Sequence, residues 1–294
     1  MVYHPYFRGK QFELGAIRET VALLAQSHFT PIIEPVREQL KVLRKTIDLM
    51  CESDVNAILV VNPQIGDHTT NQAGLNELLS THYAGAANVA PGLLMTQGMG
   101  PQDAVDFSEL YGERQVALIH SGTTDGANLA LALNGIANIG DHIFMPANSG
   151  KLYIQHFQTK PGRTLVRDGF KLQVANRDYP ATEFYSDLHV TYQLEGMDGG
   201  FGDFLTVGDH YREGGGPAYA VAIHITFIDP SQDNGMYIHH FLSDSQNTPT
   251  NPAGKFAEAV AKLITAVDAE NSPILETAAV AEFREFHKIG RAHV

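Results

Sequence analysis

One carboxylate stands in an apolar setting near the start of the chain. Glu34 lies within the run Pro31-Ile-Ile-Glu-Pro-Val36, and Arg8 and Lys10 follow the preceding apolar segment. A carboxylate in such surroundings is desolvated unless a cation pairs with it. The combination could perform acid–base chemistry, with Glu34 transferring a proton and the two cations stabilising charge. The alternative is a structural ion pair without a part in any reaction.

The stretch from Phe201 to Asp244 holds further groups that could react. Asp203 is a second candidate acid or base, and His240 could assist it or bind a metal. A divalent metal ion such as Zn²⁺, Mn²⁺ or Mg²⁺ is an open possibility, although the chain has no H-x-H, H-E-x-x-H or D-x-D motif. Further residues of this stretch that could ligate it are Asp209, His210 and Asp244.

Several cations gather in an irregular segment in the middle of the chain. If this segment folds over the residues near Arg8 and Lys10, the added positive charge favours a small anionic ligand, with a phosphate or carboxylate group. Acidic neighbours at Asp168 and Asp178 equally allow a solvated loop of mixed charge. The cations of the segment are Arg163, Arg167, Lys171 and Arg177.

The first half of the chain alternates short apolar runs with helical patterns, which predicts parallel strands covered on both faces. This alternation of strand and helix patterns stops at about 150–200, where we expect an insertion between strands six and seven. Strand seven is then expected at 204–207, and the runs 218–228 and 237–242 could form a hairpin at Asn234-Gly235. The first six runs are 2–7, 31–36, 57–62, 92–96, 116–120 and 142–146.

These elements predict an α/β fold, a TIM-like (β/α)8 barrel forming a single domain over residues 1–294. The carboxyl ends of barrel strands share one face, and the active sites of barrel enzymes lie there. We expect three catalytic residues on it: Glu34, Asp203 and His240. The expected ligand-binding residues are Arg8, Lys10, Asn62 and His120, with Arg167 and Lys171 from the insertion.

Composition narrows the class of protein. Hydrophobic residues make up 44% of 294 residues, enough for a sizeable core. The net charge of −13 argues against nucleic-acid binding over the whole surface, and no run of the chain is apolar enough for a membrane span. Cys51 is the only cysteine, so the chain has no internal disulfide and a reducing cytoplasm is the expected compartment.

Several motifs resemble the bacterial and phage proteins labelled "beta family protein". They are Tyr6-Phe-Arg-Gly-Lys-Gln-Phe-Glu13, Pro31-Ile-Ile-Glu-Pro35, Phe201-Gly-Asp-Phe204, Gly214-Gly-Gly-Pro-Ala-Tyr-Ala-Val-Ala-Ile-His224 and His240-Phe-Leu-Ser-Asp244. The resemblance covers most of the chain. It implies a setting in mobile or phage-defence gene neighbourhoods, and a chain expected to continue beyond His293, but no particular activity.

Two hypotheses for the function follow. The first is a barrel enzyme, or ligand-binding protein, that acts on a phosphate-bearing ligand such as a nucleotide or phosphodiester. The second is a non-catalytic recognition or partner subunit of a defence or mobile-element system, which would bind a protein partner. In that case the aromatic residues of the middle segment would face the partner, unless they pack onto the barrel. These are Tyr153, Phe157, Phe170, Tyr179, Phe184, Tyr185 and Tyr192.

Overall fold

The chain forms two compact units in the computed structural model, which describes residues 2–214, 216 and 218–292. Unit 1 comprises Met1–Asp168 and Thr191–Leu205, and unit 2 comprises Gly169–Val190 and Thr206–Val294. The barrel expected over the whole chain therefore accounts for unit 1.

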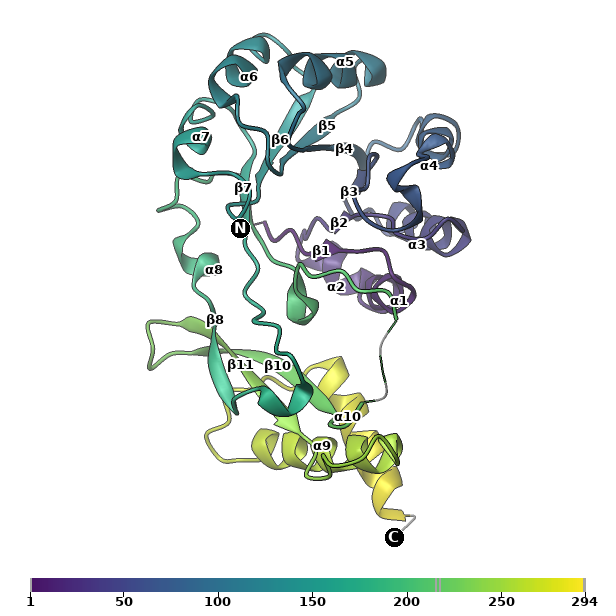
Figure 1. Cartoon of the computed structure of the whole chain (residues 1–294), viewed down its shortest axis with the longest axis vertical. Helices are drawn as coiled ribbons and strands as arrows, with labels where there is room; N and C mark the ends of the chain where they lie inside the picture. The colour runs from purple at the N-terminus through teal and green to yellow at the C-terminus, as the bar shows by residue number, and fades with distance from the viewer. Residues whose placement is uncertain (1, 215, 217, 293–294) are drawn as a thin grey trace. The chain divides into compact units, whose positions relative to one another are not determined.

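Unit 1 contains eight parallel strands, each hydrogen-bonded to the next in the order β1-β2-β3-β4-β5-β6-β7-β9 (Figure 1). The expected (β/α)8 barrel is confirmed. Its strands are β1 (Tyr6–Phe7), β2 (Ile32–Ile33), β3 (Ala57–Val60), β4 (Val89–Met95), β5 (Val116–His120), β6 (Ile139–Phe144), β7 (Arg163–Val166) and β9 (Gly200–Gly202).

The last strand returns to the first and closes the barrel. Tyr3 and Phe201 form a parallel bridge, and the backbone N–H of Tyr6 donates to the carbonyl of Asp203 over 2.9 Å. Glycine makes this approach possible, because a Cβ on Gly202 would collide with the carbonyl oxygen of His4.

Helices surround the strands of unit 1 (Figure 1). Among the described residues, no helix combines the length and the apolar composition that crossing a membrane requires. The helices of the chain up to β9 are α1 (Gln11–Glu19), α2 (Val21–Gln26), α3 (Lys41–Glu52), α4 (Ala73–Glu77), α5 (Pro101–Tyr111), α6 (Gly126–Ala132), α7 (Lys151–Gln155) and α8 (Leu188–Thr191), with short turns of helix at Asp67–Thr69, Leu78–His82 and Asn176–Asp178.

Alternate side chains of each strand fill the barrel interior, as the pleat of a strand requires. Ile32, Ile58 and Ile119 are at most 1% exposed, and burying each contributes roughly 1.5–3 kcal/mol. The alternation decides which polar residues at the strand ends face inward. The interior cluster consists of Tyr6, Ile32, Ile58, Val60, Leu94, Ala117, Ile119, Ile143, Met145, Val166 and Phe204.

The predicted position of the insertion is corrected by one strand. Strand seven is Arg163–Val166, within the segment expected to be inserted, and Leu205–Val207 forms a helical turn instead of a strand. The chain leaves unit 1 after β7, at Gly169–Val190. β7 has only three buried residues after its arginine, and the first of them is Thr164. Glycine and proline precede the strand, so no continuous apolar run marks it.

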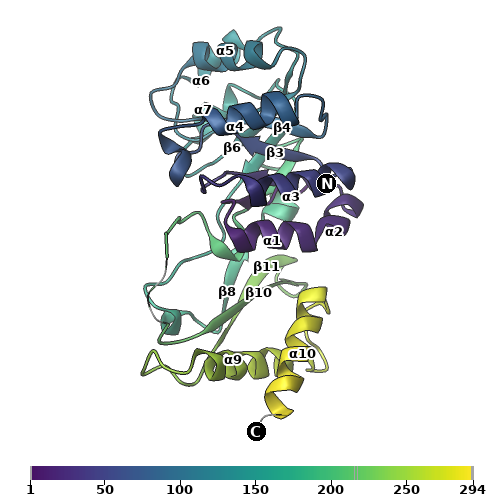
Figure 2. The ribbon, with the colours of Figure 1, turned by 90° about the vertical axis from the view of Figure 1, so that its right-hand side faces the viewer.

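Unit 2 is built on a three-stranded antiparallel sheet in the order β10-β11-β8. Its strands are β8 (Thr182–Ser186), β10 (Ala222–Asp229) and β11 (Gly235–Leu242). The expected hairpin is confirmed, but its turn is the loop 230–234, with Asp233 and Asn234 at positive φ, and Gly235 already pairs with Asp229 in the ladder. Two helices, α9 (Pro252–Val267) and α10 (Ala278–Ala292), lie beside the sheet and against each other (Figure 2).

Candidate active site

The carboxyl ends of β1 and β2 bring Arg8 and Glu34 together. Tyr6 and Ile32 both face the barrel interior, so the residues two positions later, Arg8 and Glu34, face the same way. The guanidinium of Arg8 forms an ion pair with Oε2 of Glu34, which is 1% exposed. The pairing expected from the sequence is therefore present.

Two more donors reach the Glu34 carboxylate. The phenol of Tyr6 donates to Oε2 over 2.8 Å, and the backbone N–H of Gln64, beyond β3, donates to Oε1 over 2.9 Å. We call Tyr6, Arg8, Glu34 and Phe204 the mouth cluster. Its carboxylate thus has a cation, a phenol and a peptide amide as partners, which compensates the cost of burying its charge.

Arg8 is held by aromatic rings as well as by Glu34. Its guanidinium carbon lies 5.0 Å from the ring centre of Tyr6 and 5.1 Å from that of Phe204. Its backbone N–H donates to Oε2 of Glu13, in the first helix. The cation therefore has a fixed position at the carboxyl end of the barrel.

Tyr6 remains a hydrogen-bond donor over the physiological pH range. Its burial, followed by the negative charge of Glu34, raises the pKa of the Tyr6 phenol well above its usual value. Among the described residues Oε1 of Glu34 accepts one hydrogen bond, so this oxygen keeps a lone pair that could take a substrate proton. Acid–base chemistry is what this arrangement can perform.

Asn62 has a structural partner at the same end of the barrel. Its side-chain amide donates to the carbonyl of Leu94 over 2.9 Å and accepts from the N–H of Leu94 over 2.8 Å. This pair of bonds extends the β3–β4 pairing beyond β3. Lys10, partly exposed, is the residue before the first helix.

Asp203 belongs to a different environment from its neighbour Phe204. Its Oδ1 accepts from the Tyr3 hydroxyl over 2.6 Å and from the N–H of Leu205 over 2.9 Å. Because Phe204 faces the interior, the side chain of Asp203 faces the other side of the strand. Asp203 therefore fastens β9 to the start of the chain.

His120 does not join the mouth cluster. Ala117 and Ile119 fill the interior, so His120 faces the helix layer, where its Nδ1 lies 2.6 Å from the Tyr153 hydroxyl. Its Nε2 lies 3.1 Å from Nδ1 of His142, and the ring is fully buried. Burial, followed by the proximity of His142, lowers the pKa of His120 well below its usual value. The two histidines are neutral members of a core.

The cations of the middle segment have acidic partners. In unit 1, Arg167 pairs with Glu195 at 3.1 Å and Arg163 with Asp198 at 3.2 Å. In unit 2, Lys171 pairs with Glu183 at 3.2 Å. Arg177 lies 3.9 Å from Asp178. The positive charge that the sequence indicated is thus largely balanced where it lies.

His240 and Lys171 meet at one carboxylate within unit 2. Nε2 of His240 lies 3.3 Å from Oε1 of Glu183, and Nδ1 of His240 lies 2.6 Å from Nδ1 of His224. Since Glu183 accepts from Nε2–H of His240, the Nδ1 of His240 accepts from His224. Burial, and then His240, lowers the pKa of His224 to about 4.

The expected metal ligands are not gathered at one point. Asp244 accepts a hydrogen bond from Lys262 over 2.6 Å, while His240 is engaged with Glu183 and His224. Within residues 2–214, 216 and 218–292, no group of three or more His, Cys, Asp or Glu side chains could hold a metal ion.

Most aromatic residues of the middle segment are buried, which favours the packing alternative over a partner-facing surface. Tyr153 and Phe157 pack against His120, and Phe170 and Tyr179 against the histidines of unit 2. Phe184, at 42% exposure, is the exposed one of the set. The buried ones are Tyr153, Phe157, Phe170, Tyr179, Tyr185 and Tyr192.

Sequence reasoning missed three contributors: Tyr6, Phe204 and Glu183. Tyr6 could have been found, because it shares its strand face with Arg8 two residues later. Phe204 lies at the start of the strand predicted at 204–207, and its short apolar run does not indicate which side chains face inward. Nothing in the sequence places Glu183 beside His240, since the two meet through the β8–β11 pairing.

Comparison with known proteins gives a structural similarity only. No family model and no curated protein matches the sequence. Among solved structures, a mutant of the O-GlcNAc hydrolase of Thermobaculum terrenum is similar, with a TM-score of 0.41 and 13% identity over 69% of this chain. The match spans 54% of that protein, so this chain corresponds to about half of its length.

Proposed function

We propose that unit 1 is a barrel enzyme whose reaction takes place at the mouth cluster. The observation that carries the proposal is the buried Arg8–Glu34 pair at the carboxyl ends of β1 and β2. This is the end of a (β/α)8 barrel at which catalytic residues lie. A buried ion pair is a poor way to gain stability, because desolvation offsets much of its attraction.

In the proposed reaction Glu34 transfers the proton. Tyr6 and Arg8 hold its Oε2, while Oε1 accepts from the N–H of Gln64 and keeps a second lone pair to accept a proton from the substrate. The fixed guanidinium of Arg8 then stabilises negative charge that develops nearby. Asp203 is less suited to this role, because its side chain faces away from the barrel interior, where it binds Tyr3 and the N–H of Leu205.

The proposed substrate class is a phosphate-bearing ligand such as a nucleotide or phosphodiester. This substrate class is supported by the positions of Arg8 and Lys10 just after β1. The planar guanidinium of arginine and the ammonium group of lysine both bind phosphate oxygens well. The paired cations of the middle segment add little to it. A role in phage defence is supported by the sequence resemblance alone.

A ligand panel followed by an activity assay tests the proposal. Thermal unfolding of the full chain is measured with nucleotides and phosphate esters, each with and without Mg²⁺, Mn²⁺ or Zn²⁺, because a ligand of the folded state raises the melting temperature. We expect a shift that is reduced in Lys10→Gln and retained in Lys45→Gln, a control at an exposed position of α3.

The ligand that causes the shift is then assayed for turnover. Glu34→Gln should bind it but form no product, since the amide keeps the shape of the carboxylate and loses its basicity. Full turnover by Glu34→Gln would contradict the role of Glu34. If no compound of the panel shifts the melting temperature, the alternative of a non-catalytic recognition or partner subunit is favoured.

A further inference from the structure

β10 is an edge strand of the unit 2 sheet, with β11 on one side only. The N–H of Ser243 donates to the carbonyl of Val221, so the pair Val221–Ser243 is hydrogen-bonded. Such pairs recur at every second residue of an antiparallel ladder. Ile223, Ile225 and Phe227 therefore bond to β11, and the residues between them direct their backbone groups outward.

Among the residues that the structure describes, the outward backbone groups of β10 lack hydrogen-bond partners. Outside the ladder with β11, the described residues provide no hydrogen bond to the backbone of Ala222, His224, Thr226 or Ile228. Natural edge strands are commonly blunted by proline, lysine or a bulge. β10 has none of these, since its sequence is Ala-Ile-His-Ile-Thr-Phe-Ile-Asp and its pairing with β11 runs without a shift.

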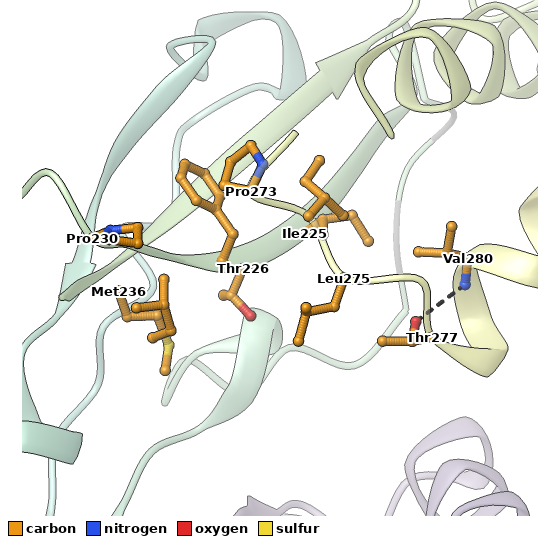
Figure 3. A pocket seen from close by; sticks show the side chains of 11 residues that line it. Ile225, Thr226, Pro230, Met236, Pro273, Leu275, Thr277 and Val280 are labelled. Atoms are coloured by element: carbon orange, nitrogen blue, oxygen red, sulfur yellow. Dashed lines mark hydrogen bonds between the residues drawn. The ribbon is translucent and has the colours of Figure 1, made fainter. Parts of the chain in front are cut away.

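An apolar groove of about 400 Å³ adjoins the same strand (Figure 3). Ile225 and Phe227 line it from one face of the sheet and Ile228 from the other, so the groove passes along the edge of β10. Pro273 and Leu275, from the segment between α9 and α10, also line it. Leu275 is 78% exposed, and none of the described residues that line the groove is charged.

We propose that this edge and groove bind an extended segment of a partner protein by strand addition, with apolar side chains at alternate positions of the segment. The outward donors and acceptors repeat every second residue, about 6.6–6.8 Å apart, which is the spacing of another extended backbone. Every second side chain of the bound segment would face the groove and contact its apolar lining residues. Strand addition needs only one extended segment, and Pro273 and Leu275 add apolar contacts for its side chains.

Peptide selection on the full chain tests this inference, which does not depend on the activity of the barrel. A display library of random short linear peptides is selected on the purified protein, and the peptides obtained are synthesised and titrated. We expect sequences with apolar residues at every second position. Binding should protect the amides of His224, Thr226 and Ile228 from hydrogen exchange, whereas Ile225 and Phe227 are protected without peptide.

Two substitutions at one position supply the decisive comparison. Thr226→Pro removes an outward N–H, which an edge strand tolerates, and should weaken peptide binding about tenfold or more. Thr226→Val keeps the N–H and should bind nearly as the unaltered protein does. Retained protection of Ile225 and Phe227 in Thr226→Pro shows that the hairpin is folded.

Three outcomes would overturn the inference. The selected peptides could lack apolar alternation, or they could bind Thr226→Pro and Thr226→Val equally. The third is self-association: if sedimentation shows a dimer that Thr226→Pro abolishes, and no peptide is selected, the edge belongs to a second copy of this chain.

Discussion

The phenol of Tyr6 donates a hydrogen bond of 2.8 Å to the same carboxylate oxygen of Glu34 that Arg8 contacts. Tyr6 is 2% exposed and Glu34 1%, so removing the phenol hydroxyl takes one donor from a buried carboxylate. The contact joins the carboxyl ends of β1 and β2, two strands with only two residues each in the ladder. Because this ladder is short, the side-chain contacts of Glu34 with Tyr6 and Arg8 add to the stability of the β1–β2 pairing.

Tyr6→Phe should lower the free energy of unfolding by about 1–3 kcal/mol, the range for a buried hydrogen bond to a charged group. The ring itself stays, so its packing on Phe204 is kept. Urea unfolding followed by circular dichroism measures the change. Tyr219→Phe, at a half-exposed tyrosine of unit 2, is the control and should leave the stability unchanged. Equal stability of Tyr6→Phe and the unaltered protein would show that the bond contributes nothing.

Arg8→Met should destabilise the chain by about 3–5 kcal/mol, because it leaves the carboxylate of Glu34 buried without its cation. The double variant Arg8→Met with Glu34→Met should recover most of that loss, since neither charge remains. The same urea titration compares the single and double variants. If the double variant is at least as unstable as Arg8→Met alone, the ion pair itself, rather than the orphaned charge, accounts for the effect.

Histidines buried in the helix layer should make stability depend on pH. Burial, and then the charges of Lys160 and Arg163, lowers the pKa of His142 from 6.5 to about 4. Because the folded pKa is the lower one, the contribution is present above pH 6.5 and is lost as the pH falls toward 4. The full loss is on the order of 3 kcal/mol for this 1% exposed residue.

His142→Gln removes this titration while keeping an amide that can bond to His120. Between pH 7 and pH 4.5 the variant should therefore lose less stability than the unaltered protein does. Urea unfolding at the two pH values gives both differences. His287→Gln, at a partly exposed site of α10, should behave as the unaltered protein. Identical pH slopes for His142→Gln and the unaltered protein would exclude His142 as a contributor.

Particular residues show what the sequence could and could not predict. The Arg8–Glu34 pairing was predictable, because a carboxylate in an apolar strand needs a nearby cation. The direction of the His120 side chain was not predictable. β5 is buried on both faces, so its apolar run lacks the alternation that would indicate which side chains point inward. Likewise β8 meets β11 through long-range pairing, so the contact of His240 with Glu183 had no local signal.

Closure of the barrel rests on the small residues of β9, which gives a last prediction. In Gly202→Ala, the added methyl group would collide with the carbonyl oxygen of His4 and lie 3.0 Å from Cγ2 of Val166. The backbone of β1 cannot retreat without breaking the bond from Tyr6 N–H to Asp203. We therefore expect the free energy of unfolding to fall by about 1–3 kcal/mol, as for an overpacked core.

Gly150→Ala is the matched control, because a Cβ at Gly150 meets none of the described atoms within 4 Å and the φ of −67° at Gly150 suits alanine. Hydrogen exchange should show faster opening at Tyr6 in Gly202→Ala alone, and unchanged exchange there would mean that β9 does not hold β1 in place.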